Sequence, residues 1–199
     1  MCCDPTDVTV ENAAALVDKG ATFLKFDVVT DINGKVTAGT KNGPAITELI
    51  DAVDEYVEKS RRSSVGFNLE MHTAAGKEEG KTVPYYHDHV DYIMADLWGR
   101  YMGQRLMMTG SDYRSLNHMN EKYPEVDLAF KVEKGTEDAE KAMKRLKFTP
   151  KWISFHYTDI NEAIIKKYHD KGMYVSVWGI DSQETADQTS TLDVDALIY

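Results

Sequence analysis

The chain alternates short apolar runs with segments of helical periodicity along nearly its whole length. The apolar runs are rich in β-branched and aromatic residues and too short for helices, which is typical of buried strands. Seven such runs occur, at residues 21–29, 64–71, 105–109, 126–131, 151–156, 173–178 and 194–199. A helix is expected between each strand and the next, and strands joined in this way are parallel with right-handed crossovers. The order of elements therefore predicts an α/β fold.

Seven strand and helix units could form a doubly wound open sheet or most of a (β/α)8 barrel. No expected strand is followed by a glycine-rich loop of the G-x-G-x-x-G type, which marks the doubly wound nucleotide-binding folds. The barrel is therefore favoured. Residues 31–34 (DING) predict a turn, after which residues 35–38 are expected to return as a short extra strand. We find neither a linker nor a repeat, so residues 1–199 are expected to form one domain.

The composition excludes several classes of partner. Acidic residues outnumber basic ones 33 to 23, and the resulting formal charge of −10 disfavours binding to nucleic acid or to anionic lipid surfaces. No apolar run approaches the ~20 residues that span a bilayer. Cys2 and Cys3 are adjacent and close no useful loop, so no disulfide framework is expected. We expect a soluble protein of unassigned compartment, with the cytoplasm favoured and export open if a leader has been removed.

Two carboxylates and a histidine stand near the ends of neighbouring expected strands. Asp27 lies within one apolar run, Glu70 ends the next, and His72 follows two residues later on the same face. In a barrel the carboxyl ends of the strands line the active site. Such a set could hold a hard divalent cation and use the imidazole for proton transfer. The alternative is that the carboxylates anchor loops or form ion pairs, and Lys25, on the face of Asp27, could neutralise Asp27.

Other polar and aromatic residues at strand ends are weaker candidates. Trp178 ends a strand, where it could form one wall of a ligand pocket or pack at the barrel mouth. His156 also ends a strand and could face the site or serve in packing. His87 and His89 resemble a metal-binding tract, but we expect them in a polar loop before a helix.

Several segments, in the correct order, resemble the glycerophosphodiester phosphodiesterase family. The segments are residues 10–16 (VENAAAL, like its Pro-Glu-Asn-Thr helix start), 24–28 with 30–34 (LKFDV and TDING, like its E-x-D-V strand and K-D-G turn), 68–72 (NLEMH, like its third acidic strand), 109–124 (like its S-S-F-D...L...P segment), 169–178 (HDKGMYVSVW, like its H-x-x-G-x-x-V-x-x-W segment) and 192–198 (LDVDALI, like its last strand). The order of these segments, rather than any one of them, carries the resemblance.

The resemblance implies a (β/α)8 barrel that hydrolyses glycerophosphodiesters with Ca²⁺ or Mg²⁺, using three carboxylate ligands and two histidines. Asp27 and Glu70 match two of the ligands, whereas Lys25 stands where the family has the third. The first catalytic histidine belongs to an H-R-G motif where this chain has residues 1–3 (MCC), and the second to an H-D pair absent from residues 36–40 (VTAGT). His72 replaces a lysine of the family pattern.

These differences lead to three functional hypotheses. The first is a divergent barrel whose phosphodiester hydrolysis is weak or lost but which keeps a pocket for a phosphorylated or glycerol-like ligand, with Lys25, Trp178 and His156 as candidate binding residues. The second is an active metal-dependent enzyme that uses Asp27 and Glu70 as metal ligands and His72 in catalysis. The third is a non-catalytic interaction module.

The barrel is also expected to be incomplete, because the first strand and the last helix are missing from the pattern. These two elements are neighbours in a barrel, so one sector would expose strand edges. We therefore expect a second copy of the chain, or a partner chain, to cover that sector.

Overall fold

The computed structural model describes residues 8–73, 78–100, 102–136 and 138–198. An eight-stranded sheet has the strand order β2-β1-β3-β4-β5-β6-β7-β8, and all neighbours except β1 and β2 are parallel. The parallel strands are β1 (Phe23–Thr30), β3 (Gly66–Met71), β4 (Leu106–Gly110), β5 (Asp127–Lys131), β6 (Trp152–His156), β7 (Tyr174–Trp178) and β8 (Ala196–Leu197). The predicted series of seven strands is confirmed.

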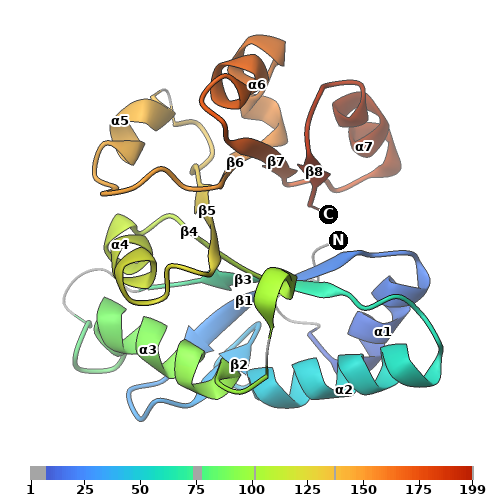
Figure 1. Cartoon of the computed structure of the whole chain (residues 1–199), viewed down its shortest axis with the longest axis vertical. Helices are drawn as coiled ribbons and strands as arrows, with labels where there is room; N and C mark the ends of the chain where they lie inside the picture. The colour runs from blue at the N-terminus through green and yellow to red at the C-terminus, as the bar shows by residue number, and fades with distance from the viewer. Residues whose placement is uncertain (1–7, 74–77, 101, 137, 199) are drawn as a thin grey trace.

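The helices surround the curled sheet on its outside (Figure 1). They are α1 (Val10–Asp18), α2 (Ile46–Lys59), α3 (Tyr86–Leu97), α4 (Tyr113–Lys122), α5 (Ala139–Met143), α6 (Glu162–His169) and α7 (Gln183–Ser190), with the 3-10 turns η1 (Gly103–Arg105) and η2 (Tyr157–Asp159). This arrangement is an incomplete TIM-type barrel, as predicted. No helix in the described ranges combines the length and the apolar character needed to cross a membrane.

The short strand β2 (Val36–Ala38) pairs antiparallel with the end of β1. The turn before it depends on Asp31, whose Oδ1 accepts hydrogen bonds from the backbone N–H groups of Asn33 and Lys35, each at 2.9 Å. Gly34 has a φ of +86°, a left-handed conformation that glycine adopts without steric cost. The predicted turn and return strand are confirmed.

Two helices are shorter than the sequence predicts. The periodic pattern indicates helices over residues 111–122 and 136–146, whereas α4 begins at Tyr113 and α5 covers only Ala139–Met143. Each begins directly after an aspartate whose side chain accepts a hydrogen bond from the first turn: Asp112 from the N–H of Arg114 at 2.9 Å, and Asp138 from that of Lys141 at 3.0 Å. These N-caps set the starts of the helices.

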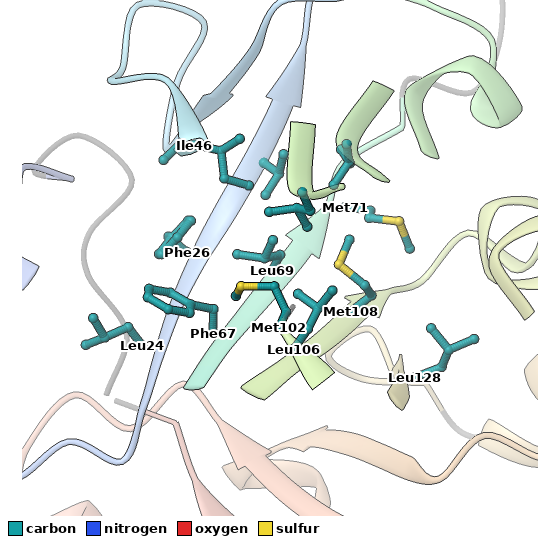
Figure 2. Packing of buried hydrophobic residues seen from close by; sticks show 14 of the residues in the cluster. Leu24, Phe26, Ile46, Phe67, Leu69, Met71, Met102, Leu106, Met108 and Leu128 are labelled. Carbon is teal, nitrogen blue, oxygen red and sulfur yellow. The ribbon is translucent and has the colours of Figure 1, made fainter. Parts of the chain in front are cut away.

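The core lies between the sheet and the helices. Alternate residues of the strands point outward into it, among them Phe26 of β1 and Phe67 of β3, whose rings meet edge to face with centroids 6.2 Å apart. Figure 2 shows how leucine, methionine and isoleucine side chains fill the space around them. Since successive side chains of a strand point to opposite faces, the residues between these apolar positions must point into the barrel.

The two ends of the curved sheet do not pair with each other among the described residues. A cavity of about 580 Å³ lies between them, lined by Phe23 of β1 and Leu197 of β8 together with residues at the amino ends of the intervening strands. Among the described residues, the gap in the barrel therefore lies between the β1 side and the β8 side of the sheet. Its coverage by a second copy or a partner chain stays a prediction.

We predict that Phe67→Ala lowers the free energy of unfolding by about 3–5 kcal/mol, because it opens a cavity at a fully buried position. Phe23→Ala is the matched control, since Phe23 is 38% exposed at the edge of the same sheet. Urea unfolding followed by circular dichroism measures both variants. Equal losses for the two variants would contradict the placement of the core.

Candidate functional site

The candidate site lies inside the barrel, toward the carboxyl ends of β1 and β3. Asp27 and Glu70 occupy paired positions in the parallel register of these strands. His72 follows β3, and its Nε2 lies 3.1 Å from Asp27 Oδ1 and 3.4 Å from Glu70 Oε1. Ligand atoms of these three side chains all lie within 4.8 Å of one another. The structure thus brings together the three residues that the sequence marks as candidates.

Two lysines contact the same carboxylate. Lys25 Nζ lies 2.5 Å from Glu70 Oε2 and 3.8 Å from Asp27 Oδ1, while Lys131 Nζ, from β5, lies 2.5 Å from Glu70 Oε1. The Glu70 side chain is only 4% exposed. Because both of its oxygens face an ammonium group, Glu70 is a buried anion held between two cations.

These contacts keep both carboxylates ionised. Burial by itself would raise the pKa of Glu70, but the charges of Lys25 and Lys131 outweigh it and hold the pKa below its usual 4.5. Burial opposes ionisation of Asp27 as well, and the hydrogen bond and charge of His72, with the two lysines, lower its pKa below 3.8. At neutral pH the two carboxylates and two lysines therefore balance in charge.

His72 adds a positive charge when it is protonated. The hydrogen bond to Asp27 raises the pKa of His72 above its usual 6.5, with the negative charges of Asp27 and Glu70 acting in the same direction, against burial and Lys131. Its side chain is half exposed, so it also borders solvent. The site as a whole is neutral to positive in a chain whose formal charge is −10.

Trp178 and His156 lie beside this cluster. Lys131 Nζ stands 4.5 Å from the centroid of the Trp178 ring, and His156 packs edge-on against that ring at 4.7 Å. Trp178 Nε1 is buried and has no hydrogen-bond partner among the described residues. His156 Nδ1 lies 2.8 Å from Thr158 Oγ1, and this contact fixes the imidazole against the Trp178 ring.

Sequence reasoning missed Lys131 and misplaced His89. Lys131 ends a strand whose alternation directs it inward with Ala129, which is the signal that could have found it. The expectation that His87 and His89 lie in a polar loop is wrong, because both lie in α3. His89 is buried in line with Ile93 and Leu97, a spacing of four that marks one helix face.

His89 is a neutral group close to the site. Its Nδ1 lies 2.7 Å from Thr30 Oγ1, and its Nε2 has no partner among the described residues. Burial, together with the charge of His72, lowers the pKa of His89 to about 4. Both histidines line a cavity of about 230 Å³ beside the ends of β1 and β3.

A family model described as the glycerophosphoryl diester phosphodiesterase family matches residues 7–199. The chain belongs to this family. Membership agrees with the incomplete barrel. The family's H-R-G position corresponds to residues 1–3, which lie outside the described residues.

Solved structures of similar fold include a Silicibacter pomeroyi protein classed as a glycerophosphoryl diester phosphodiesterase, with 16% identity, a TM-score of 0.76 and coverage of 96% of this chain and 83% of that chain. An Oleispira antarctica phosphodiesterase in complex with the product sn-glycerol-3-phosphate has 13% identity, a TM-score of 0.74 and coverage of 96% and 85%. A glycerophosphodiester phosphodiesterase from Parabacteroides distasonis has 12% identity, a TM-score of 0.73 and coverage of 95% and 84%. No curated protein matches this sequence.

The raised pKa of His72 predicts a pH-dependent contribution to stability. Because the pKa of His72 is higher in the folded state than the value of about 6.5 in the unfolded state, protonation of His72 stabilises the fold. This stabilisation is complete below about pH 6.5 and is lost as the pH rises through the folded-state pKa. We expect His72→Gln to remove a contribution on the order of 0.5–1 kcal/mol at about pH 5.5, the range of partly exposed ion pairs, and less at about pH 8.5.

Urea unfolding of wild type and His72→Gln at the two pH values measures this difference. His87→Gln is the comparison variant: His87 is similarly exposed, at 44%, but its ion-pair partner Asp88 is 42% exposed against 20% for Asp27, so a smaller cost is expected. A cost of His72→Gln that is equal at both pH values would contradict the ion pair with Asp27.

Proposed function

We propose that this barrel binds a small phosphorylated ligand at the Lys25, Lys131 and His72 cluster without a metal ion, and that its phosphodiester hydrolysis is weak or lost. The observation that carries the proposal is the pairing of both Glu70 oxygens with lysine ammonium groups at 2.5 Å. The product complex of the Oleispira antarctica phosphodiesterase supports sn-glycerol-3-phosphate as the ligand to test first.

The charges at the site do not fit a divalent cation. Hard cations such as Ca²⁺ and Mg²⁺ are bound by oxygen ligands, which must be available as anions. Here the two lysine ammonium groups already neutralise the two carboxylates, and Lys25 stands at the position of the third acidic ligand of the family pattern. A cation would have to displace both lysines and leave their charges buried beside it, which is strongly unfavourable.

The same groups suit an anion. A lysine ammonium carries three N–H donors, and Lys131 uses one of them toward Glu70. Protonated His72 borders solvent and adds a further donor and charge. The buried Trp178 Nε1–H lacks an acceptor beside Lys131, and a phosphate oxygen would supply one. We assign Lys25, Lys131 and His72 to the phosphate and Trp178 to the wall of the pocket, with His156 supporting the Trp178 ring.

Binding is tested by thermal unfolding of the protein with sn-glycerol-3-phosphate in the presence of a chelator. A ligand that binds only the folded state at about 100 times its Kd stabilises that state by about 2.7 kcal/mol, so we expect a rise in Tm for the wild type. Lys131→Met should abolish most of this rise, because it removes one of the two buried cations.

The matched control is Lys166→Met, which removes a 75% exposed lysine on α6 and should keep the full response. If Lys131→Met weakens the fold, the shift caused by the ligand is still read against the variant's own unliganded Tm. A wild-type Tm that does not change with sn-glycerol-3-phosphate would reject the proposed function.

A metal-dependent phosphodiesterase is the second candidate. It is favoured by the proximity of Asp27, Glu70 and His72, whose ligand atoms lie within 4.8 Å of one another. In this reading Asp27 and Glu70 hold Ca²⁺ or Mg²⁺ and His72 transfers a proton. The two candidates differ in whether the lysines or a metal ion neutralise the negative charge of the carboxylates.

Lys25→Glu separates the two candidates. The substitution replaces a buried cation by a third carboxylate, so we expect Ca²⁺ or Mg²⁺ to bind this variant at least tenfold more tightly than wild type in calorimetry, because oxygen ligands and negative charge favour hard cations. If the clustering of three carboxylates weakens the apo fold, a rise in the Tm of the variant on adding metal checks the result.

Lys166→Glu serves as the control for the change in net charge. Hydrolysis of glycerophosphocholine is expected to stay at background in wild type with either metal, because the family's two acid and base histidines have no counterparts in this sequence. Brisk metal-dependent turnover by wild type would favour the second candidate instead.

A further inference from the structure

We propose that a groove leading from His72 to Arg145 binds a second anionic group of the same ligand, so that the protein prefers phosphodiesters whose alcohol part carries a negative charge. This inference rests on the proposed function, because the first phosphate is assigned to the lysine cluster. The determinant of ligand preference is then Arg145, which lies outside that cluster.

The groove begins at the candidate site. It has a volume of about 490 Å³ and is lined by residues that follow β3, residues at the start of α4, and Arg145 of the segment between α5 and β6. Its polar lining includes His72, Thr73, Asp112, Tyr113, Arg114 and Arg145. Because His72 also contacts Asp27 and Glu70, it is the residue at which the cluster and the groove meet.

Arg114 is already neutralised within the groove wall. Its guanidinium lies 2.8 Å from Asp112 and 2.9 Å from Glu79, and Thr73 Oγ1 donates to Asp112 at 2.7 Å. These groups form a closed network with opposite charges in contact. The network joins one guanidinium to two carboxylates, so it carries a net charge of −1, and the positive charge along the groove comes from Arg145 and protonated His72.

Arg145 has no carboxylate within ion-pair distance among the described residues. By contrast, Arg62, Arg100, Arg105 and Arg114 each pair with an aspartate or a glutamate, and Arg61, which has no such pair among the described residues, lies outside the groove. The guanidinium of Arg145 is instead held over the ring of Tyr113, 3.8 Å from its centroid, and donates to Tyr113 Oη at 2.6 Å.

This arrangement positions a cation without neutralising it. Stacking on an aromatic ring fixes the plane of the guanidinium, and the remaining N–H donors form a planar fork that matches a carboxylate or a phosphate. A fixed, unpaired arginine at the end of a groove that begins at a phosphate-binding cluster is suited to an anionic substituent of the bound ester. A neutral or cationic substituent would gain nothing from it.

A pair of ligands that differ by one phosphate tests the inference: glycerophosphoinositol and glycerophosphoinositol 4-phosphate, titrated into wild type at low ionic strength in chelator. We expect the 4-phosphate to bind about two- to fivefold more tightly, the range that a charge-assisted contact with an exposed arginine allows. The preference should fall as salt is added, because exposed charges are screened.

Arg145→Gln should reduce the affinity for the 4-phosphate to that for glycerophosphoinositol and leave the latter unchanged. Arg145→Lys should retain part of the preference, since it keeps the charge without the planar fork. Arg61→Gln is the matched control, because it removes an exposed arginine outside the groove lining with the same change in net charge. Inorganic phosphate added together with glycerophosphoinositol should not raise the affinity for glycerophosphoinositol, because the second anion must be part of the same ligand.

The outcomes separate the two proposals. If neither ligand binds wild type, the proposed function is rejected and this inference with it. If both ligands bind with equal affinity, or if Arg145→Gln weakens both of them equally, the phosphate-binding function stands and the assignment of Arg145 is overturned.

Discussion

The site depends on how one buried carboxylate is neutralised. Glu70 is almost completely enclosed by the barrel, and a lone ionised carboxylate there would be strongly unfavourable. The two lysine contacts remove that penalty and keep Glu70 charged. They also order Lys25 and Lys131, which come from strands separated by two others in the sheet. The arrangement of cations at the barrel mouth is therefore a consequence of neutralising Glu70.

Replacing an acidic ligand by Lys25 changes what the same barrel can bind. With an acid at that position, three carboxylates would attract a divalent cation, and the cation would be the main positive charge at the site. With a lysine there, two ammonium groups of the protein neutralise the carboxylates in place of a metal ion, which is the basis of the proposed binding of an anion. A family fold can in this way keep affinity for a phosphate group while losing the group that supports hydrolysis. The unpaired Arg145 extends the same electrostatic preference along the groove beside His72.

Much of the fold was predictable because its signal is local. Period-two alternation in β1 and β3 separates Phe26 and Phe67, which face the helices, from Asp27 and Glu70, which face the interior. Helix starts were less predictable, because the side chain of Asp138 caps α5 inside a segment whose composition is helical throughout. His89 was misplaced because its neighbours in sequence are polar, whereas its burial follows from the packing of α3 against β1 at Thr30.

By itself, the sequence determined the order of strands and helices, the inward face of each strand, and the presence of a lysine where the family has an acid. All of these follow from residue type and spacing. Only the tertiary structure decided that Lys131 reaches Glu70, that Arg145 stands over Tyr113 in a groove that begins at His72, and that Trp178 lies against Lys131. Such contacts join residues from distant strands and loops, so they depend on the curvature of the sheet and on side-chain packing, which no local pattern encodes.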